Sequence, residues 1–229
     1  HLSIRRQRQM CIRDRSGTGK STTCRALAKQ LDAKYVDTGA MYRVATLAVL
    51  REGVDPADTA AVIAATANLP LGVSDDPDST EVLLAGEDVS RVIREDEVTR
   101  NVSAVSAIPE VRENLVALQR KLAREAHRAI VEGRDIGTVV LADAPAKAFM
   151  TASAEVRAQR RQAQNEKAGI ASDYETVLAD VQRRDAADSS RKASPLRPAE
   201  DATLVDTSNM SPEDVLEALI NVVKESVND

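Results

Sequence analysis

Hydrophobic positions alternate between strand-like and helix-like spacings from residue 16 to the end of the chain. Cys24, Leu27, Ala28 and Leu31 follow the i, i+3, i+4, i+7 spacing of an amphipathic helix. Short apolar runs predict strands at "AKYVD" (33–37), "RAIVEG" (128–133), "AKAFMTA" (146–152) and "ATLVDTS" (202–208). Strands that alternate with helices predict a parallel sheet, whose ligands bind at the carboxyl ends of the strands.

The remaining patterns predict further helices and one region of different character. Helical spacings cover 55–67, opened by Asp55-Pro56, and then 95–108, 109–126, 153–169, 173–191 and 211–227. Ser153 and Ser211 are the expected N-caps of two of them. Residues 69–93 have apolar runs broken by Asp-Pro, Ser and Gly, which predict two or three short antiparallel strands.

The first strand of the sheet should lie just before residue 16, at "QRQMCIR" (7–13). Buried parallel strands are usually continuous Val, Ile and Leu runs, so this polar stretch predicts a poor central strand. Burying Arg8 or Arg13 without a partner would cost several kcal/mol. Because the composition changes abruptly and residue 1 is His, we hypothesise that residues 1–15 are foreign sequence joined to a domain at 16–229.

Composition narrows the class of protein. The chain of 229 residues can form one α/β domain with insertions or two small domains. Aromatic residues make up 2% and the net charge is −5, which argues against a nucleic-acid partner. No apolar run approaches the ~20 residues of a membrane helix. The two cysteines, Cys11 and Cys24, are too few for a disulfide framework. We therefore expect a cytoplasmic protein without a membrane segment, and a monomer.

A phosphate-binding loop is the first candidate for chemistry. "SGTGKST" (16–22) matches the end of the pattern G-x-x-x-x-G-K-[ST], in which backbone N–H groups and a helix N-terminus hold phosphates. Lys20 would reach the outer phosphates of ATP and Ser21 would ligate Mg²⁺. The expected ATP-binding residues are Ser16, Gly17, Thr18, Gly19, Lys20, Ser21 and Thr22. A glycine-rich helix start without a ligand is the structural alternative.

The entrance of this loop departs from the pattern. Asp14 stands where the pattern has its first glycine. A residue with a side chain resists the positive φ that a loop glycine often adopts, and a carboxylate repels triphosphate. We therefore expect weaker ATP binding and lower stability than in a variant whose apolar first strand ends in Gly-Pro.

Four further segments resemble bacterial cytidylate kinases, in the same order along about residues 16–227. They are "YVDTGAMYR" (35–43), "VSAVSAIPEVRE" (102–113), "VEGRDIGTVV" (131–140) and "RRDAADSSRKASPL" (183–196). The resemblance implies a P-loop three-layer sandwich with a five-stranded parallel sheet. It also implies a small antiparallel CMP-binding insertion at about 65–103 and a helical lid at about 153–172.

The resemblance also implies site residues. Arg43, Arg134 and Arg191 would hold the CMP phosphate, and Ser103, Arg112 and Asp135 would read cytosine. Arg184 and Asp188 would lie near the acceptor's sugar, Thr38 beside the acceptor, and Arg157 in the lid near adenine. With Lys20, the residues Arg134, Arg191 and Arg157 would act in catalysis.

The implied activity is transfer of the γ-phosphoryl group of ATP to CMP or dCMP, with Mg²⁺. The acceptor phosphate is mostly dianionic near pH 7, so alignment and charge neutralisation can replace a general base. A nucleotide-binding protein with little or no turnover is the alternative, since it would keep Lys20 and the arginines. As isolated features, Arg184 and Asp188 could be a surface helix pair, and the arginines near residue 160 a solvated helix face.

Overall fold

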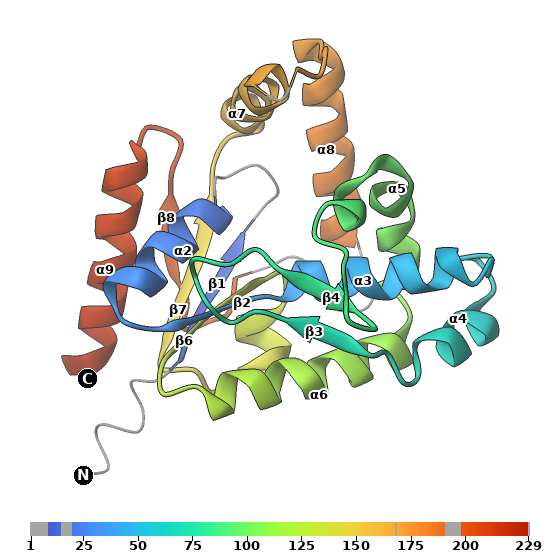
Figure 1. Cartoon of the computed structure of the whole chain (residues 1–229). Helices are drawn as coiled ribbons and strands as arrows, with labels where there is room; N and C mark the ends of the chain where they lie inside the picture. Colours follow the sequence, from blue (N-terminus) through green and yellow to red (C-terminus); the bar gives the residue numbers. More distant parts are fainter. Residues whose placement is uncertain (1–8, 15–19, 168, 191–197, 229) are drawn as a thin grey trace.

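The computed structural model describes residues 9–14, 20–167, 169–190 and 198–228. Within these residues a five-stranded parallel sheet has the order β2-β6-β1-β7-β8 (Figure 1). Its strands are β1 (Gln9–Asp14), β2 (Lys34–Asp37), β6 (Ala129–Gly133), β7 (Ala146–Thr151) and β8 (Thr203–Asp206). The alternating pattern of the sequence thus predicted the fold class correctly.

The polar first strand forms the centre of this sheet. β1 pairs with β6 on one side and with β7 on the other, so the strand expected just before residue 16 is present at the centre of the sheet. The lower stability expected of this polar strand stays a prediction, because Arg8 and the side chain of Arg13 lie outside the described residues. Met10, Cys11 and Ile12 are 3%, 1% and 0% exposed, which shows that burial falls on the strand's apolar middle. Three consecutive apolar side chains satisfy both faces of the sheet, because successive strand residues point to opposite faces. The hypothesis that residues 1–15 are foreign falls mostly on residues outside the described ranges and stays a hypothesis.

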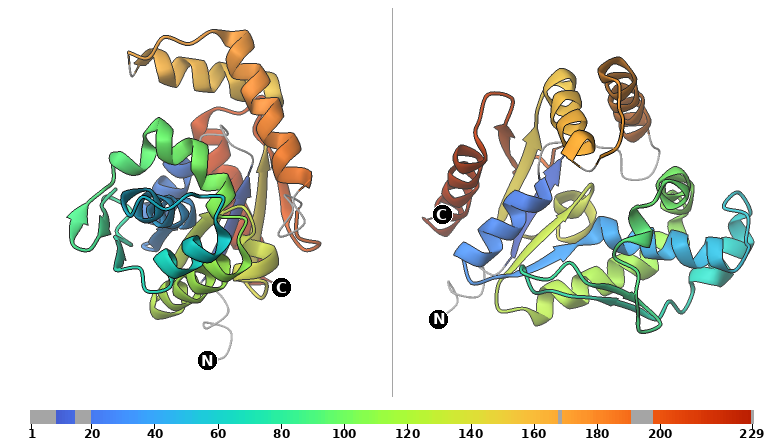
Figure 2. Two further views of the ribbon diagram at one scale, coloured as in Figure 1. Left: turned by 90° about the vertical axis from the view of Figure 1, so that its right-hand side faces the viewer. Right: turned by 45° about the horizontal axis from the view of Figure 1, so that its top comes forward.

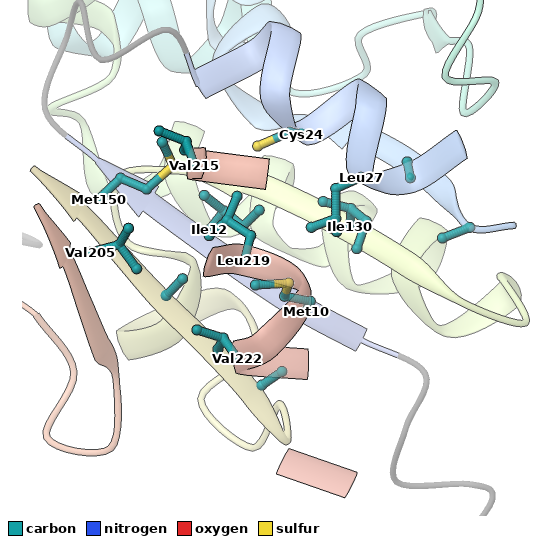
Figure 3. Close-up of a cluster of buried hydrophobic side chains, with 14 of the residues drawn as sticks. Met10, Ile12, Cys24, Leu27, Ile130, Met150, Val205, Val215, Leu219 and Val222 are labelled. Atoms are coloured by element: carbon teal, nitrogen blue, oxygen red, sulfur yellow. The ribbon is translucent and has the colours of Figure 1, made fainter. Parts of the chain in front are cut away.

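Two helices cover one face of the sheet. α2 (Lys20–Gln30) and α9 (Pro212–Asn228) pack Cys24, Leu27 and Leu219 onto Met10 and Ile12 of β1 (Figure 3). α9 begins at Pro212, and the Ser211 hydroxyl accepts a hydrogen bond from the Asp214 N–H at 3.1 Å, as an N-cap does. This aliphatic core fixes the first turn of α2 at the carboxyl edge of the sheet.

The opposite face is covered by α6 (Pro109–Glu125) and by η2 (Ile136–Val140), a π-helical turn. Cys11 points to this face, and its burial raises the pKa of the thiol to about 12. The thiol is therefore neutral at physiological pH, in keeping with a cysteine that acts as a small apolar residue.

The region after β2 builds a separate layer beside the sheet. It contains α3 (Thr38–Arg51), α4 (Thr59–Thr66), η1 (Val92–Arg94) and α5 (Asp96–Val105). A small antiparallel sheet of β3 (Leu71–Val73), β4 (Val82–Leu84) and β5 (Glu87–Asp88) confirms the antiparallel strands predicted for 69–93. α4 starts later than predicted, because Asp58 rather than Asp55 caps it, accepting from the Ala61 N–H at 3.1 Å.

Two helices project from the carboxyl edge of the sheet. α7 (Ala154–Lys167) follows β7, and α8 (Tyr174–Ser190) packs against it; both stand above the strands in Figure 1 and in the right-hand view of Figure 2. Ser153 caps α7, accepting from the Val156 N–H at 3.2 Å, as predicted. No helix in the described ranges combines the length and apolar character needed to cross a membrane.

Candidate active site

A polar cavity of about 560 Å³ opens at the carboxyl edge of the sheet. Its lining comes from the first turn of α2, the ends of β2 and β6, α3, the η1–α5 segment, and the helices α7 and α8. Parallel sheets bind ligands at this edge, where loops and helix N-termini converge. The fold therefore brings residues that are far apart in the sequence around one polar space.

The α2 side of the cavity carries the lysine and hydroxyls of the sequence motif. Lys20, Ser21 and Thr22 all line the cavity. The Ser21 hydroxyl donates to Glu132 Oε1 at 2.8 Å, and Lys20 Nζ lies 3.8 Å from the same oxygen. Ser16, Gly17, Thr18 and Gly19 lie outside the described residues. Asp14 ends β1, and the structure describes its backbone only.

Glu132 is a site residue that the sequence analysis missed. It is 2% exposed, ends β6 next to the central strand, and lines the cavity. A buried carboxylate is stable only with partners, and here a hydroxyl and a lysine approach it. The signal that could have found it is its place at the end of a buried strand, directly before "GRD".

Hard oxygen atoms suited to Mg²⁺ are present beside the motif. The Ser21 hydroxyl, the Glu132 carboxylate and the Asp37 carboxylate all line the cavity. Within the described ranges, this cavity included, no group of three or more His, Cys, Asp or Glu side chains is placed to hold a metal ion. That donor set fits Mg²⁺, which binds through one or two carboxylates and substrate phosphates and keeps several waters.

Four arginines, each from a different element, line the cavity and are called here its arginine wall. They are Arg43 of α3, Arg94 of η1, Arg161 of α7 and Arg184 of α8. Arg94 was not predicted from the sequence, and Arg161 had been grouped only with the arginines near residue 160. Burial, and then the like charge of Arg161, lowers the pKa of Arg184. A cavity wall of mutually repelling cations is a favourable place for an anion.

Arg43 is held in this wall by neutral oxygens. Its Nη1 donates to the Ile93 carbonyl oxygen and to the Thr99 hydroxyl, both at 2.9 Å. Burial and the neighbouring charge of Arg94 lower the pKa of the Arg43 guanidinium. An incoming phosphate would relieve this repulsion, so the surroundings of Arg43 favour an anionic ligand.

Two of the residues predicted to read the base form a buried ion pair. Arg112 in α6 donates to the Asp135 carboxylate, which directly precedes η2 and is 3% exposed. Arg112 also donates to the Ser106 carbonyl oxygen at 3.0 Å, and its guanidinium lies 5.2 Å from the centre of the Tyr42 ring. The third predicted residue, Ser103, is exposed on α5. The pair presents a donor and an acceptor side by side.

The residues predicted to read the base do not line this cavity, and neither do several other predicted residues. Thr38 is 2% exposed and donates to the Glu132 carbonyl oxygen at 2.8 Å, so it braces β6. Arg157 is 1% exposed and binds Asp185 of α8. Arg134 is exposed after β6. The side chain of Asp188 and the whole of Arg191 lie outside what the structure describes.

Comparisons with known proteins agree with this geometry. The family model described as cytidylate kinase matches residues 11–225. The chain is 71% identical over 211 residues to a cytidylate kinase of Corynebacterium glutamicum, with 92% of each chain covered. It is 68% identical over 211 residues to a cytidylate kinase of Corynebacterium efficiens, again with 92% of each covered.

A solved structure shows the same fold at low sequence identity. A gluconokinase from Sinorhizobium meliloti 1021 superposes with a TM-score of 0.50 at 13% identity, covering 98% of this chain and 95% of that one. At this identity the likeness concerns the fold alone. The family rests instead on the match along residues 11–225 and on relatives of high identity. This chain belongs to the cytidylate kinase family.

Proposed function

We propose that the protein transfers the γ-phosphoryl group of ATP to CMP or dCMP, giving ADP and CDP or dCDP. The observation that carries the proposal is the cavity that Lys20 and Ser21 line together with the arginine wall. Both substrates carry phosphates, and a cavity lined by several cations can bring two phosphate groups together. The high identity to named cytidylate kinases supports this function over a nucleotide binder without turnover.

The chemistry needs alignment more than it needs proton transfer. The acceptor phosphate is mostly dianionic near pH 7 and attacks without a general base. Lys20 and the arginines neutralise the charge that spreads over the transferred group. Mg²⁺, when bound, adds charge neutralisation, and Ser21 with Glu132 are the side chains that would hold it.

Base selection is assigned to Arg112, Asp135 and Ser103. A carboxylate accepts from the 4-amino group of cytosine, while Arg112 can donate to the adjacent ring nitrogen. Uracil has a carbonyl oxygen in place of that amino group, and the Asp135 carboxylate would repel it. The ion pair between Arg112 and Asp135 supports this assignment because it holds donor and acceptor in a fixed relation.

The remaining roles complete the proposal. Arg43, Arg134 and Arg191 hold the acceptor phosphate, Arg184 and Asp188 lie near its sugar, and Thr38 lies beside it. Residues 65–103 form the acceptor-binding insertion, and residues 153–172 form a lid that excludes water on closing. We further propose a cytoplasmic monomer, to be checked by light scattering of the purified protein.

An assay of substrate choice tests the proposed function. ADP release should be fast with CMP and dCMP and far slower with UMP or AMP. Asp135→Asn should lower the rate with CMP and reduce the preference for CMP over UMP by about tenfold or more, as loss of a charged hydrogen bond predicts. Asp143→Asn removes the same charge at an exposed position and should leave the preference unchanged. Equal rates with CMP and UMP in the unaltered protein would refute the base assignment.

A further inference from the structure

The junction between α7 and α8 contains a buried, two-pronged ion pair. Arg157 Nη1 lies 3.0 Å from Asp185 Oδ1, and Arg157 Nη2 lies 2.5 Å from Asp185 Oδ2. The side chains are 2% and 15% exposed. The Nε–H of Arg157 donates to the Ala152 carbonyl oxygen at 3.0 Å, directly after β7. One guanidinium thus joins the end of a central strand to both projecting helices.

A second arginine ties α7 to the sheet. Arg160 Nη1 donates to the Thr207 hydroxyl at 3.0 Å, and Arg160 Nη2 donates to the Thr207 carbonyl oxygen at 2.6 Å. Thr207 in turn donates to the Thr151 carbonyl oxygen at 3.1 Å. α7 is therefore anchored at the ends of β7 and β8, and Arg157 extends this anchorage to α8.

The cavity arginines of these helices lie next to the ion pair in the sequence. Arg161 follows Arg157 by one helical turn in α7, and Arg184 directly precedes Asp185 in α8. Both line the cavity that also holds Lys20. Since the two guanidiniums repel each other, a tie between their helices is needed to keep them at one separation.

We propose that Asp185 and Arg157 are positioning residues, whose ion pair sets the separation at which Arg161 and Arg184 bind nucleotide phosphates. This differs from the direct catalytic role that the family resemblance implied for Arg157. The guanidinium of Arg157 is engaged by Asp185 and Ala152 and does not line the cavity. The inference rests on the proposed function for the identity of the ligands.

Asp185→Asn is the direct test, because it keeps the shape of the side chain and removes its charge. Mg·ATP and CMP are each titrated alone by calorimetry, well below the melting temperature. The dissociation constant of one or both ligands should rise by about ten- to a hundredfold, as displaced binding groups predict. Glu175→Gln removes the same charge from an exposed position of α8 and should bind both ligands like the unaltered protein.

A double-mutant cycle separates positioning from simple stabilisation. If Asp185 acts through the cavity arginines, Asp185→Asn should weaken binding much less in an Arg184→Ala background. Should Asp185→Asn not fold, Asp185→Glu keeps the charge but shifts the fork, and it should also weaken binding. Arg157→Lys should also weaken ligand binding, because lysine cannot form the two parallel hydrogen bonds to Asp185.

Two results would overturn the inference. One is a Kd within about twofold of the unaltered value for both ligands in Asp185→Asn, whatever happens to the melting temperature. The other is an effect of Asp185→Asn that is the same with and without Arg184. Failure of the proposed function looks different: the unaltered protein would then bind the ligands without phosphorylating CMP.

Discussion

Arg43 in α3 is half-buried and Arg157 in α7 is buried, and their surroundings differ in kind. The hydrogen bonds of Arg43 go to a carbonyl oxygen and a hydroxyl, and burial, followed by the charge of Arg94, lowers the pKa of its guanidinium. Arg157 binds a carboxylate through two nitrogens and a carbonyl oxygen through a third. The first faces the cavity and the second lies within the protein.

By this difference, Arg43 is suited to bind an anionic ligand, whereas Arg157 stabilises the fold. A guanidinium among like charges raises the free energy of the protein without ligand, and phosphate binding recovers that cost. A guanidinium bound to a buried carboxylate already has its counter-charge, so removing it takes charged hydrogen bonds away from the acid. Predictions for the two arginines therefore have opposite signs for stability.

The largest effect on stability should come from Arg157→Ala. This change removes the two Arg157 hydrogen bonds from the Asp185 carboxylate. Loss of one partner of a buried pair costs about 3–5 kcal/mol. Urea unfolding, followed by circular dichroism, measures the change. Arg183→Ala is the matched control, because Arg183 pairs with Asp180 on the surface of α8. Equal losses of unfolding free energy in Arg157→Ala and Arg183→Ala would contradict the structural role of Arg157.

Arg43→Gln should act on catalysis and spare stability. A charge-assisted phosphate contact is worth roughly 1.5–3 kcal/mol, so kcat/KM for CMP should fall by roughly ten- to 150-fold. The free energy of unfolding should stay the same or rise, because one of several repelling charges is removed. If Arg43→Gln instead unfolds as readily as Arg157→Ala, Arg43 is a structural residue and the comparison fails.

The smallest effect should come from Arg51→Gln, on the same helix as Arg43. Arg51 and Glu87 form the same fork as the buried pair, at 2.7 and 2.8 Å, but their side chains are 39% and 58% exposed. Water and salt screen such an exposed pair, so it contributes little to stability despite its good geometry. The melting temperature at pH 7 should change little, and CMP phosphorylation should be unaffected.

The pH dependence of this exposed pair has a definite sign. The hydrogen bond from Arg51 holds the pKa of Glu87 below its ordinary value of 4.5. The small stabilisation is therefore present above pH 4.5 and is lost as the pH falls through the lowered pKa. Melting curves of the unaltered protein and Arg51→Gln should converge on acidification, and a gap that widens there would contradict this account.

The sequence by itself determined the fold class and gave the motif on which the proposed phosphate-binding site rests. Hydrophobic spacing is a local property, and it located the strands, the antiparallel region and the helix that begins at Lys20. Lys20 and Ser21 were also readable, because a short motif contains all the geometry that phosphate binding needs. The first strand tolerates a central position despite its polar residues, because burial falls on Met10, Cys11 and Ile12.

Only the tertiary structure decided which charges are paired. Glu132 meets Ser21, 111 residues away, and Arg157 meets Asp185, 28 residues away, so neither partner can be read from local spacing. Apart from the family resemblance, local spacing does not distinguish Arg43, Arg157 and Arg184 from one another. Their roles differ because packing gives a carboxylate to one and leaves the others among like charges around a cavity. The energy of an ion depends on its neighbours in space, and the fold supplies those neighbours.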